Sequence, residues 1–284
     1  MNWFDEGALY SQIATFLRED LGRGDITTQT VVARNTRARA RFVAGETMVV
    51  AGLEAAEEVF LSLDSQQQLE AFVADGEEVE GGKVIARTIG FADVLLSAEQ
   101  VALNLIQRLS GIATLTNRYV KALEGTNCQV VDSRATAPGL RLLEKYAVKL
   151  GGGVNGRFGL DDGVLITANH LAIGGGIARS LNITKEKLGH LHKIAVQVGN
   201  EADAREATTS GADILVTTNP DPVVLATLVA VARELAPGIR VEYSGNVTPE
   251  GARLVAEAGI SLISIEALTN GAPASKISFQ MQAF

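Results

Sequence analysis

The sequence predicts an α/β protein in which a smaller N-terminal α+β sandwich domain is followed by a TIM-like α/β barrel with about six βα units. Two observations lead to this prediction. The second half of the chain alternates short apolar runs with amphipathic stretches, several of which end at glycine, and this is the pattern of strands and helices around a parallel sheet. The first part of the chain instead carries strand-like runs joined by glycine turns, with a few helical stretches between them.

Six apolar runs rich in β-branched residues are the predicted barrel strands, and each ends in a polar or small residue. They cover residues 128–134, 163–169, 193–199, 213–219, 240–246 and 262–268. Helical patterns lie between them at 139–150, 201–211, 221–238 and 248–259. Ligands of parallel α/β barrels bind at the carboxyl ends of the strands, so the chemistry is expected there.

The N-terminal part predicts a separate domain over residues 1–113, with the barrel over 114–269. Its expected helices lie at 8–22 and 53–63, and its expected strands lie within 37–52 and 69–90. A long helix over 97–125 leads into the barrel. The tail, 270–284, is expected to pack back on a domain, and the N-terminal domain is the candidate.

Composition narrows the class of partner. The net charge of −8 argues against a nucleic-acid or membrane-surface binder, because both need a basic surface. The single cysteine, Cys128, excludes internal disulfides and fits a reducing cytoplasm. The first residues lack a signal-peptide pattern, and no run approaches the roughly 18 apolar residues of a membrane span. We therefore expect a cytoplasmic protein whose partner is a small carboxylate or other anionic metabolite, held by local cations.

The predicted strand ends give the candidate site residues. These are Arg134, Asn169, His170, Gln197, Thr218, Ser244, Gly245, Asn246 and Glu266, together with Arg157, which follows a run of three glycines, 151–153. With only three histidines in the chain, two of them in one HLH triplet, a histidine-based metal site is not expected.

Arg134 and Arg157 are the candidate anion clamp, because guanidinium groups bind carboxylate or phosphate with two parallel hydrogen bonds. The alternative is that each arginine pairs with a local acid such as Asp132 or Asp161. His170 is a candidate acid or base, with a structural role as the alternative. Glu266 and Lys149 are further candidates for moving protons. The glycine run could hold an anion with its amides, or serve only to make a tight turn.

Several blocks of the chain resemble quinolinate phosphoribosyltransferase, also called carboxylating nicotinate-nucleotide pyrophosphorylase. The blocks, in order, are EDLGRGDITT, NLIQRLSGIAT, DSRATAPGLRLLEKYAVKLGGGVNGRFGLDDGVLITANH, SGADILV, YSGNVTPEGARLVAEAGISLISIEALTN and ASKISF. The resemblance implies a homodimer, or a higher homo-oligomer, with active sites at the subunit interface. It also implies the transfer of phosphoribose from phosphoribosyl pyrophosphate to quinolinate, with magnesium as the cofactor if that reaction is retained. The second predicted strand also resembles the molybdenum-transport-associated (ModD-like) pyrophosphorylase group in its Ala-Asn-His ending.

The family pattern places cations where this chain carries neutral residues. The helix before LSGIAT has an arginine in the family, and Gln100 occupies that position here. The family lysine that follows the first-strand arginine corresponds to Ala135, and the histidine of its Asn-His-Arg motif corresponds to Gly156. The Ile-Lys-Asp-Asn-His ending of the second strand corresponds to Ile-Thr-Ala-Asn-His, residues 166–170.

The acids of the family pattern differ as well. Its glutamate at the third strand and its aspartate at the fourth correspond to Gln197 and Thr218. The Ser-Gly-Gly phosphate loop corresponds to residues 244–246, Ser-Gly-Asn, and the Val-Gly-Ala that follows corresponds to Ile-Glu-Ala, with Glu266 at its centre. A carboxylate where backbone amides should meet a phosphate costs both charge repulsion and space.

Three hypotheses follow. The chain could carry out the family reaction, as the whole-chain resemblance implies. It could be an enzyme on the same scaffold that acts on a smaller carboxylate without phosphoribosyl pyrophosphate, as the loss of charged groups suggests. It could also be a non-catalytic binding homologue. No metal ligand is assigned among the candidate residues.

Overall fold

The computed structural model describes residues 6–284, and its contacts divide the chain into two compact units. Unit 1 takes in the described residues up to Asn117, then Ala137–Gly152 and Ala272–Phe284. Unit 2 takes in Arg118–Thr136 and Gly153–Gly271. The boundary expected at residue 113 therefore falls inside a helix, and the segment Ala137–Gly152 lies in unit 1, not with the barrel strands.

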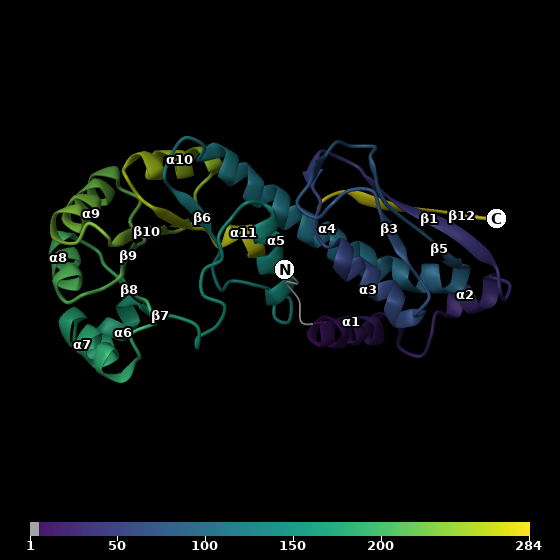
Figure 1. Cartoon of the computed structure of the whole chain (residues 1–284), viewed down its shortest axis with the longest axis horizontal. Helices are drawn as coiled ribbons and strands as arrows, with labels where there is room; N and C mark the ends of the chain where they lie inside the picture. The colour runs from purple at the N-terminus through teal and green to yellow at the C-terminus, as the bar shows by residue number, and fades with distance from the viewer. Residues whose placement is uncertain (1–5) are drawn as a thin grey trace. The chain divides into compact units, whose positions relative to one another are not determined.

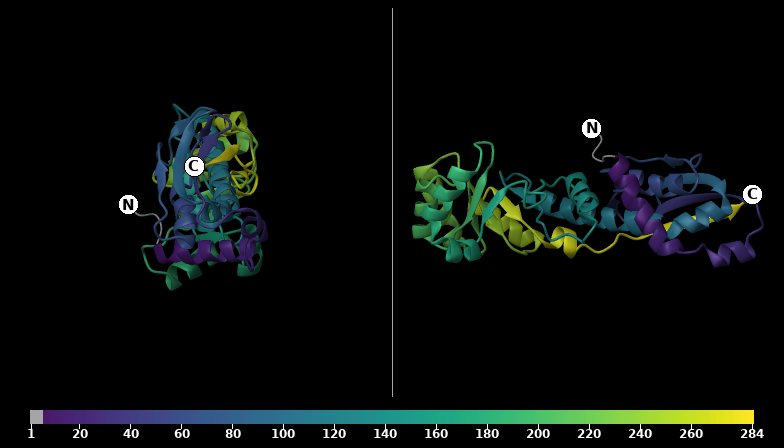
Figure 2. Two further views of the ribbon diagram at one scale, coloured as in Figure 1. Left: turned by 90° about the vertical axis from the view of Figure 1, so that its right-hand side faces the viewer. Right: turned by 90° about the horizontal axis from the view of Figure 1, so that it is seen from below.

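Unit 1 is built on a four-stranded antiparallel sheet in the order β12-β1-β5-β3. Its strands are β1 (Arg37–Ala44), β3 (Leu69–Ala71), β5 (Val84–Phe91) and β12 (Ile277–Ala283), and β2 (Met48–Val49) pairs separately with β4 (Glu78–Val79). Its helices are α1 (Glu6–Leu21), α2 (Ile26–Val31), α3 (Leu53–Leu63) and α5 (Arg141–Leu150), with most of α4 (Ala92–Ala122). The C-terminal strand, yellow in Figure 2, runs antiparallel to β1 along its whole length.

Strand β1 shows how the sequence forms this sheet. Its RARARFVA pattern alternates exposed arginines with the buried side chains of Ala38, Ala40 and Phe42, as expected for a strand with one face on a core. Phe42 packs against Phe60 of α3 at 6.3 Å and Phe279 of β12 at 4.8 Å between ring centroids. The core of unit 1 thus lies between this face of the sheet and the helices.

A buried ion pair joins two helices of unit 1. The Glu144 carboxylate of α5 is fully buried and accepts hydrogen bonds from the Arg108 guanidinium of α4 at 2.9 and 3.1 Å. Its second oxygen accepts the Ala137 amide at 3.0 Å, and Arg108 also donates to the Ala272 carbonyl at 3.0 Å. One carboxylate therefore holds α4, α5 and the chain before α5 together.

The glycine run 151–153 has a packing role at its start. A Cβ on Gly151 would lie 2.4 Å from the Ala113 carbonyl oxygen and 2.6 Å from Thr116 Cβ, so only glycine lets α5 end this close to α4. Gly152 has a φ of +89°, which glycine adopts without strain. These contacts support the turn interpretation of the run.

Unit 2 contains a six-stranded parallel sheet in the order β6-β11-β10-β9-β8-β7, and the prediction of six βα units is confirmed. The strands are β6 (Gln129–Val131), β7 (Val164–Ile166), β8 (Ile194–Gln197), β9 (Ile214–Thr217), β10 (Arg240–Ser244) and β11 (Leu262–Ser264). The helices are α6 (Ala168–Gly174), α7 (Ile177–Lys187), α8 (Glu201–Thr209), α9 (Pro222–Leu235), α10 (Pro249–Glu257) and α11 (Ala267–Asn270). Within the described residues β6 and β7 are edge strands, so the barrel is open between them.

The two faces of the unit 2 sheet differ. Val196, Leu215, Val241 and Ile263 lie on the outer face, which α8, α9 and α10 cover in Figure 1, and all four are buried. The inner face carries Gln197, Glu242 and Ser244, which are mostly but not fully buried. Polar side chains thus accumulate on the inner face.

All six predicted strands end two to four residues earlier than expected, and in two of them this changes where candidate residues lie. The run 163–169 is a strand only to Ile166, because Thr167 caps α6 and the chain turns into a helix there. Asn169 and His170 therefore lie on a helix and not at a strand end. The run 262–268 likewise ends at Ser264, and Glu266 immediately precedes α11. No helix in the described part of the chain is long and apolar enough to cross a membrane.

Candidate functional site

Arg134 and Arg157 are close enough to affect each other's charge. Arg134 follows β6, and Arg157 precedes β7. Burial and the positive charge of Arg134 lower the pKa of the Arg157 guanidinium. Arg157 donates one hydrogen bond to the Gly163 carbonyl at 3.0 Å, and neither arginine has an ion pair with any described residue. Two like charges held near each other without a carboxylate between them form a site that an anion would stabilise.

Of the two acids expected as alternative partners, Asp132 and Asp161, the structure gives Asp132 a hydrogen bond to the backbone. The Asp132 side chain is buried and accepts the Gly156 amide at 2.9 Å. Asp162, next to Asp161, accepts the Phe158 amide at 2.6 Å. No ion pair joins Arg134 or Arg157 to a described acid, and the clamp stays a prediction. A Cβ on Gly156 would lie 2.8 Å from the Asp132 carbonyl oxygen, so a side chain fits there only if the backbone moves.

His170 and Gln197 are both used to begin α6. The Thr167 amide donates to His170 Nδ1 at 3.1 Å, and the Thr167 hydroxyl lies 2.7 Å from the same nitrogen. The Gln197 side-chain oxygen accepts the Ala168 amide at 2.9 Å. The two side chains thus accept hydrogen bonds from the Thr167 and Ala168 amides, which have no acceptor within the helix. His170 and Asn169, next to it, are both exposed on α6.

The Ser-Gly-Asn loop after β10 is closed onto α11. The Asn246 side-chain oxygen accepts the Ala267 amide at 3.1 Å, and the Gly245 amide donates to the Ser264 carbonyl at 3.1 Å. Glu266 is exposed, with its backbone oxygen accepting amides of the short helix. An amide that could meet a phosphate oxygen is thus already satisfied by the Asn246 side chain.

The remaining two predicted residues lie apart from these groups. Thr218 follows β9 and is exposed. Gln100 is on α4 in unit 1, where its amide donates to Asn104 at 2.8 Å. The arginines, the α6 cap and the 244–246 loop therefore all belong to unit 2, while Gln100 belongs to unit 1.

Tyr119, which sequence reasoning missed, anchors the loop that follows Asn246. Its hydroxyl donates to the Val247 carbonyl at 2.6 Å, and its ring is buried. Burial, and then the negative charge of Glu250, raise the Tyr119 pKa. No sequence pattern indicates this bond, because Tyr119 and Val247 are far apart in the chain.

We expect Tyr119→Phe to lower the free energy of unfolding by about 0.5–1.5 kcal/mol, the usual net value of one hydrogen bond. The phenyl ring keeps the packing, so the effect isolates the bond to Val247. Urea denaturation of the variant measures it, with Tyr10→Phe as control because Tyr10 is exposed. A loss no greater than that of the control would contradict the anchoring role.

Glu242 is the second residue missed from the sequence. It lies on β10 on the inner face, and burial raises the pKa of its carboxyl to about 7. The signal was present as a charged residue inside the apolar run RVEYS. Only the strand register reveals which face it occupies.

A magnesium ion does not fit the side chains at these positions. Mg²⁺ in proteins is held by carboxylates together with water or phosphate oxygens. Gln197 supplies an amide and Thr218 a hydroxyl, and within residues 6–284 no three His, Cys, Asp or Glu side chains are grouped as a metal site. We therefore assign no chemical step to a metal held by these residues.

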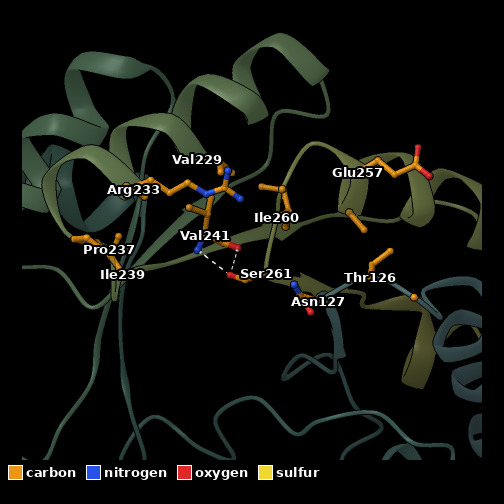
Figure 3. A pocket seen from close by; sticks show the side chains of 14 residues that line it. Thr126, Asn127, Val229, Arg233, Pro237, Ile239, Val241, Glu257, Ile260 and Ser261 are labelled. Carbon is orange, nitrogen blue, oxygen red and sulfur yellow. Dashed lines mark hydrogen bonds between the residues drawn. The ribbon is translucent and has the colours of Figure 1, made fainter.

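A separate pocket of about 430 Å³ lies at the opposite ends of the strands. Figure 3 shows Arg233, Val241, Ile260 and Ser261 on its wall, where β10 and β11 begin. Ser261 exchanges hydrogen bonds with the Val241 backbone at 3.0 and 3.1 Å. The amino ends of barrel strands usually serve stability, not catalysis. None of the candidate site residues lines this pocket.

Comparison with known families matches nearly the whole chain. The model described as quinolinate phosphoribosyl transferase, N-terminal domain, matches residues 25–110, and the model of the C-terminal domain matches residues 112–280. A probable carboxylating nicotinate-nucleotide pyrophosphorylase of Synechocystis sp. is 38% identical over 94% of this chain and 90% of its own. The corresponding protein of Bacillus subtilis is 39% identical over 94% and 91%.

Solved structures agree with the sequence matches. The nicotinate-nucleotide pyrophosphorylase of Francisella tularensis superposes with a TM-score of 0.92 at 33% identity, covering 98% of both chains. The enzyme of Ehrlichia chaffeensis superposes with a TM-score of 0.90 at 32% identity, covering 96% of this chain and 98% of the other. Both domains of the fold are therefore shared.

Proposed function

Because the chain belongs to the quinolinate phosphoribosyl transferase family, we propose that Arg134 and Arg157 form its carboxylate site, and that its ligand carries fewer negative charges than the substrates of its relatives. The observation that carries this proposal is the pair of mutually repelling guanidiniums, neither of which has an ion-pair partner among the described residues. One carboxylate between them satisfies both. We further propose that the ligand is processed without phosphoribosyl pyrophosphate.

The charges at the site support the smaller ligand. A phosphoribosyl pyrophosphate bears several negative charges, and each charge-assisted contact to it is worth about 1.5–3 kcal/mol. The positions that the family pattern gives to cations hold Gln100, Ala135, Gly156 and Thr167. The Ala267 amide already donates a hydrogen bond to the Asn246 side chain, and the neighbouring Glu266 adds a negative charge. Few groups remain to balance a polyanion.

The family reaction is the second candidate, and the extent of the matches favours it. Relatives with 38 and 39% identity over 94% of the chain carry the name of the carboxylating pyrophosphorylase. In that case quinolinate would occupy the arginine pair, and magnesium would enter with the pyrophosphate of the second substrate. Partner side chains would have to supply the missing cations.

A homodimer is part of the proposal. The resemblance implies interface sites, and large apolar side chains are exposed around Arg157 and α6. They are Phe158 at 45%, Leu160 at 74% and Ile173 at 90% exposure. Apolar side chains exposed in this way are consistent with an association surface if they form one contiguous patch. Sedimentation equilibrium tests the dimer.

Calorimetric titration separates the two candidates. Nicotinate, quinolinate and phosphoribosyl pyrophosphate with magnesium are titrated separately into the protein, and a mixture of the last two is assayed for nicotinate mononucleotide. The proposal predicts saturable binding of a pyridine carboxylate, no binding of phosphoribosyl pyrophosphate and no product. Formation of nicotinate mononucleotide would establish the family reaction instead.

A further inference from the structure

We propose that the hydrogen bond from the Gly156 amide to the Asp132 carboxylate sets the spacing of Arg134 and Arg157, and that Asp132 and Gly156 are therefore positioning residues of the anion clamp. The inference rests on the proposed carboxylate site and adds what determines its width. Asp132 and Gly156 would act through the two arginines, without touching the ligand themselves. A clamp whose width is fixed before binding favours a group that both guanidiniums can hold at once, such as a single carboxylate.

The two arginines come from the chain next to the two edge strands of unit 2. Arg134 follows β6, and Arg157 precedes β7. Within the described residues β6 and β7 lie at opposite ends of the strand order and do not pair with each other (Figure 1). The hydrogen bonds of the sheet therefore leave the spacing of the arginines unset, and other contacts must fix it.

The chain before Arg157 is attached to the edge of β6. Its Val154 forms a parallel bridge there: the Val154 amide donates to the Val130 carbonyl at 2.8 Å, and the Asp132 amide donates to the Val154 carbonyl at 3.2 Å. The buried Asp132 carboxylate extends this attachment by two residues, because it accepts the Gly156 amide at 2.9 Å. The attachment to β6 thus reaches the residue next to Arg157.

The same bond reaches the loop that carries Arg134. Asp132 is two residues before Arg134, so a displacement of Asp132 moves the start of this loop. Beyond Arg134 the loop is fixed by Thr269, a fully buried residue of α11 whose hydroxyl donates to the Ala135 carbonyl at 2.6 Å. Arg134 is therefore held between two anchored residues, and the first of them also holds Gly156.

Arg157 is restrained on its other side by the start of β7. Its guanidinium donates to the carbonyl of Gly163, the residue before β7, at 3.0 Å. The backbone next to Arg157 is thus tied to β6, and its side chain is tied to β7. Burial, and then the charge of Arg134, lower the pKa of the Arg157 guanidinium, and the second cause agrees with two guanidiniums held near each other.

The closeness of the two segments explains the glycine at position 156. A Cβ there would lie 2.8 Å from the Asp132 carbonyl oxygen and 3.4 Å from Val131 Cγ1, so any other residue moves this segment away from β6. The φ of Gly156 is outside the left-handed region, so the backbone conformation itself does not require glycine. Alanine at this position should therefore lengthen or break the bond to Asp132 without changing any charge.

Three variants test the positioning role by calorimetric titration with nicotinate. Asp132→Ala removes the acceptor and Gly156→Ala displaces the donor, so each should weaken binding about 10-fold or more, the loss expected when one of two charge-assisted contacts is given up. Asp132→Asn keeps an oxygen that can accept the amide, and its affinity should stay within about threefold of the wild type. The matched control is Gly238→Ala, because a Cβ on Gly238 meets no atom within 4 Å.

A double-mutant cycle separates positioning from a general loss of folding. Asp132→Ala and Gly156→Ala are each combined with Arg157→Gln, which removes one arm of the clamp. If the bond acts by spacing the arginines, each should cost less than about twofold in the R157Q background, because no second guanidinium is left to place. Damage to the fold would instead weaken binding by the same factor in both backgrounds.

Each outcome decides the inference. Wild-type affinity in either D132A or G156A would overturn it and leave the proposed carboxylate site intact, and so would losses that add fully to that of R157Q. D132N as weak as D132A would also overturn it, because an acceptor alone should suffice. If D132A does not fold, G156A and its combination with R157Q decide by the same criteria. If nicotinate does not bind the wild type, or binds R157Q equally well, the proposed clamp itself fails, and this inference fails with it.

Discussion

Replacing Arg134 by glutamine should weaken carboxylate binding by about 10- to 100-fold and leave the unliganded protein at least as stable as the wild type. The loss of affinity follows from removing one charge-assisted contact, worth about 1.5–3 kcal/mol. The unchanged stability follows from the repulsion between Arg134 and Arg157, which the substitution removes. Calorimetric titration with nicotinate and a urea melt of the same sample measure both effects.

The matched control for this variant is Arg233→Gln. Arg233 lines the pocket at the other ends of the strands (Figure 3) and lies outside the candidate site. Its loss should leave carboxylate affinity unchanged. Equal weakening by R134Q and R233Q would mean that binding responds to overall charge and not to the proposed clamp. A large loss of stability in R134Q would mean that Arg134 has a structural partner.

Replacing Glu144 by alanine should destabilise the protein by about 3–5 kcal/mol, because it leaves the Arg108 guanidinium without its buried carboxylate. The Ala137 amide also loses its acceptor. For a chain of this size the midpoint of thermal unfolding should fall on the order of 10 °C. Circular dichroism of α-helix content during heating measures the change.

The exposed pair of Glu70 with Arg87 in the same unit provides the control. Both of these side chains are about half exposed, and water screens their attraction. Glu70→Ala should therefore cost less than about 1 kcal/mol. Similar losses in both variants would show that the Arg108–Glu144 pair contributes no more than a surface ion pair, contrary to our account.

The sequence is sufficient to predict the parallel sheet of unit 2, because its strands are short apolar runs separated by amphipathic helices. The errors concern where strands end. The amide and the hydroxyl of Thr167 both lie within hydrogen-bond distance of His170 Nδ1 and so cap the start of α6. This capping competes with continuation of the strand. The pairing of β12 with β1 joins distant residues, so no local pattern indicates it.

The candidate site is only partly readable from the sequence. Arg134 and Arg157 are near in sequence to predicted strand ends, and the structure places their charges within mutual influence. The role of Gln197 in capping α6 depends on a neighbouring strand, and the Asn246 contact with Ala267 depends on the order of β10 and β11. Glu242 needed the register between strands, because one residue's shift would turn it to the helix-covered face.

A high-resolution crystal structure of the protein with nicotinate tests the central claim most directly. We predict one carboxylate bound to both guanidiniums, with nitrogen–oxygen distances of about 2.7–2.9 Å to Arg134 and Arg157. Nicotinate bound elsewhere, with the two arginines turned to Asp132 or Asp161, would contradict the clamp.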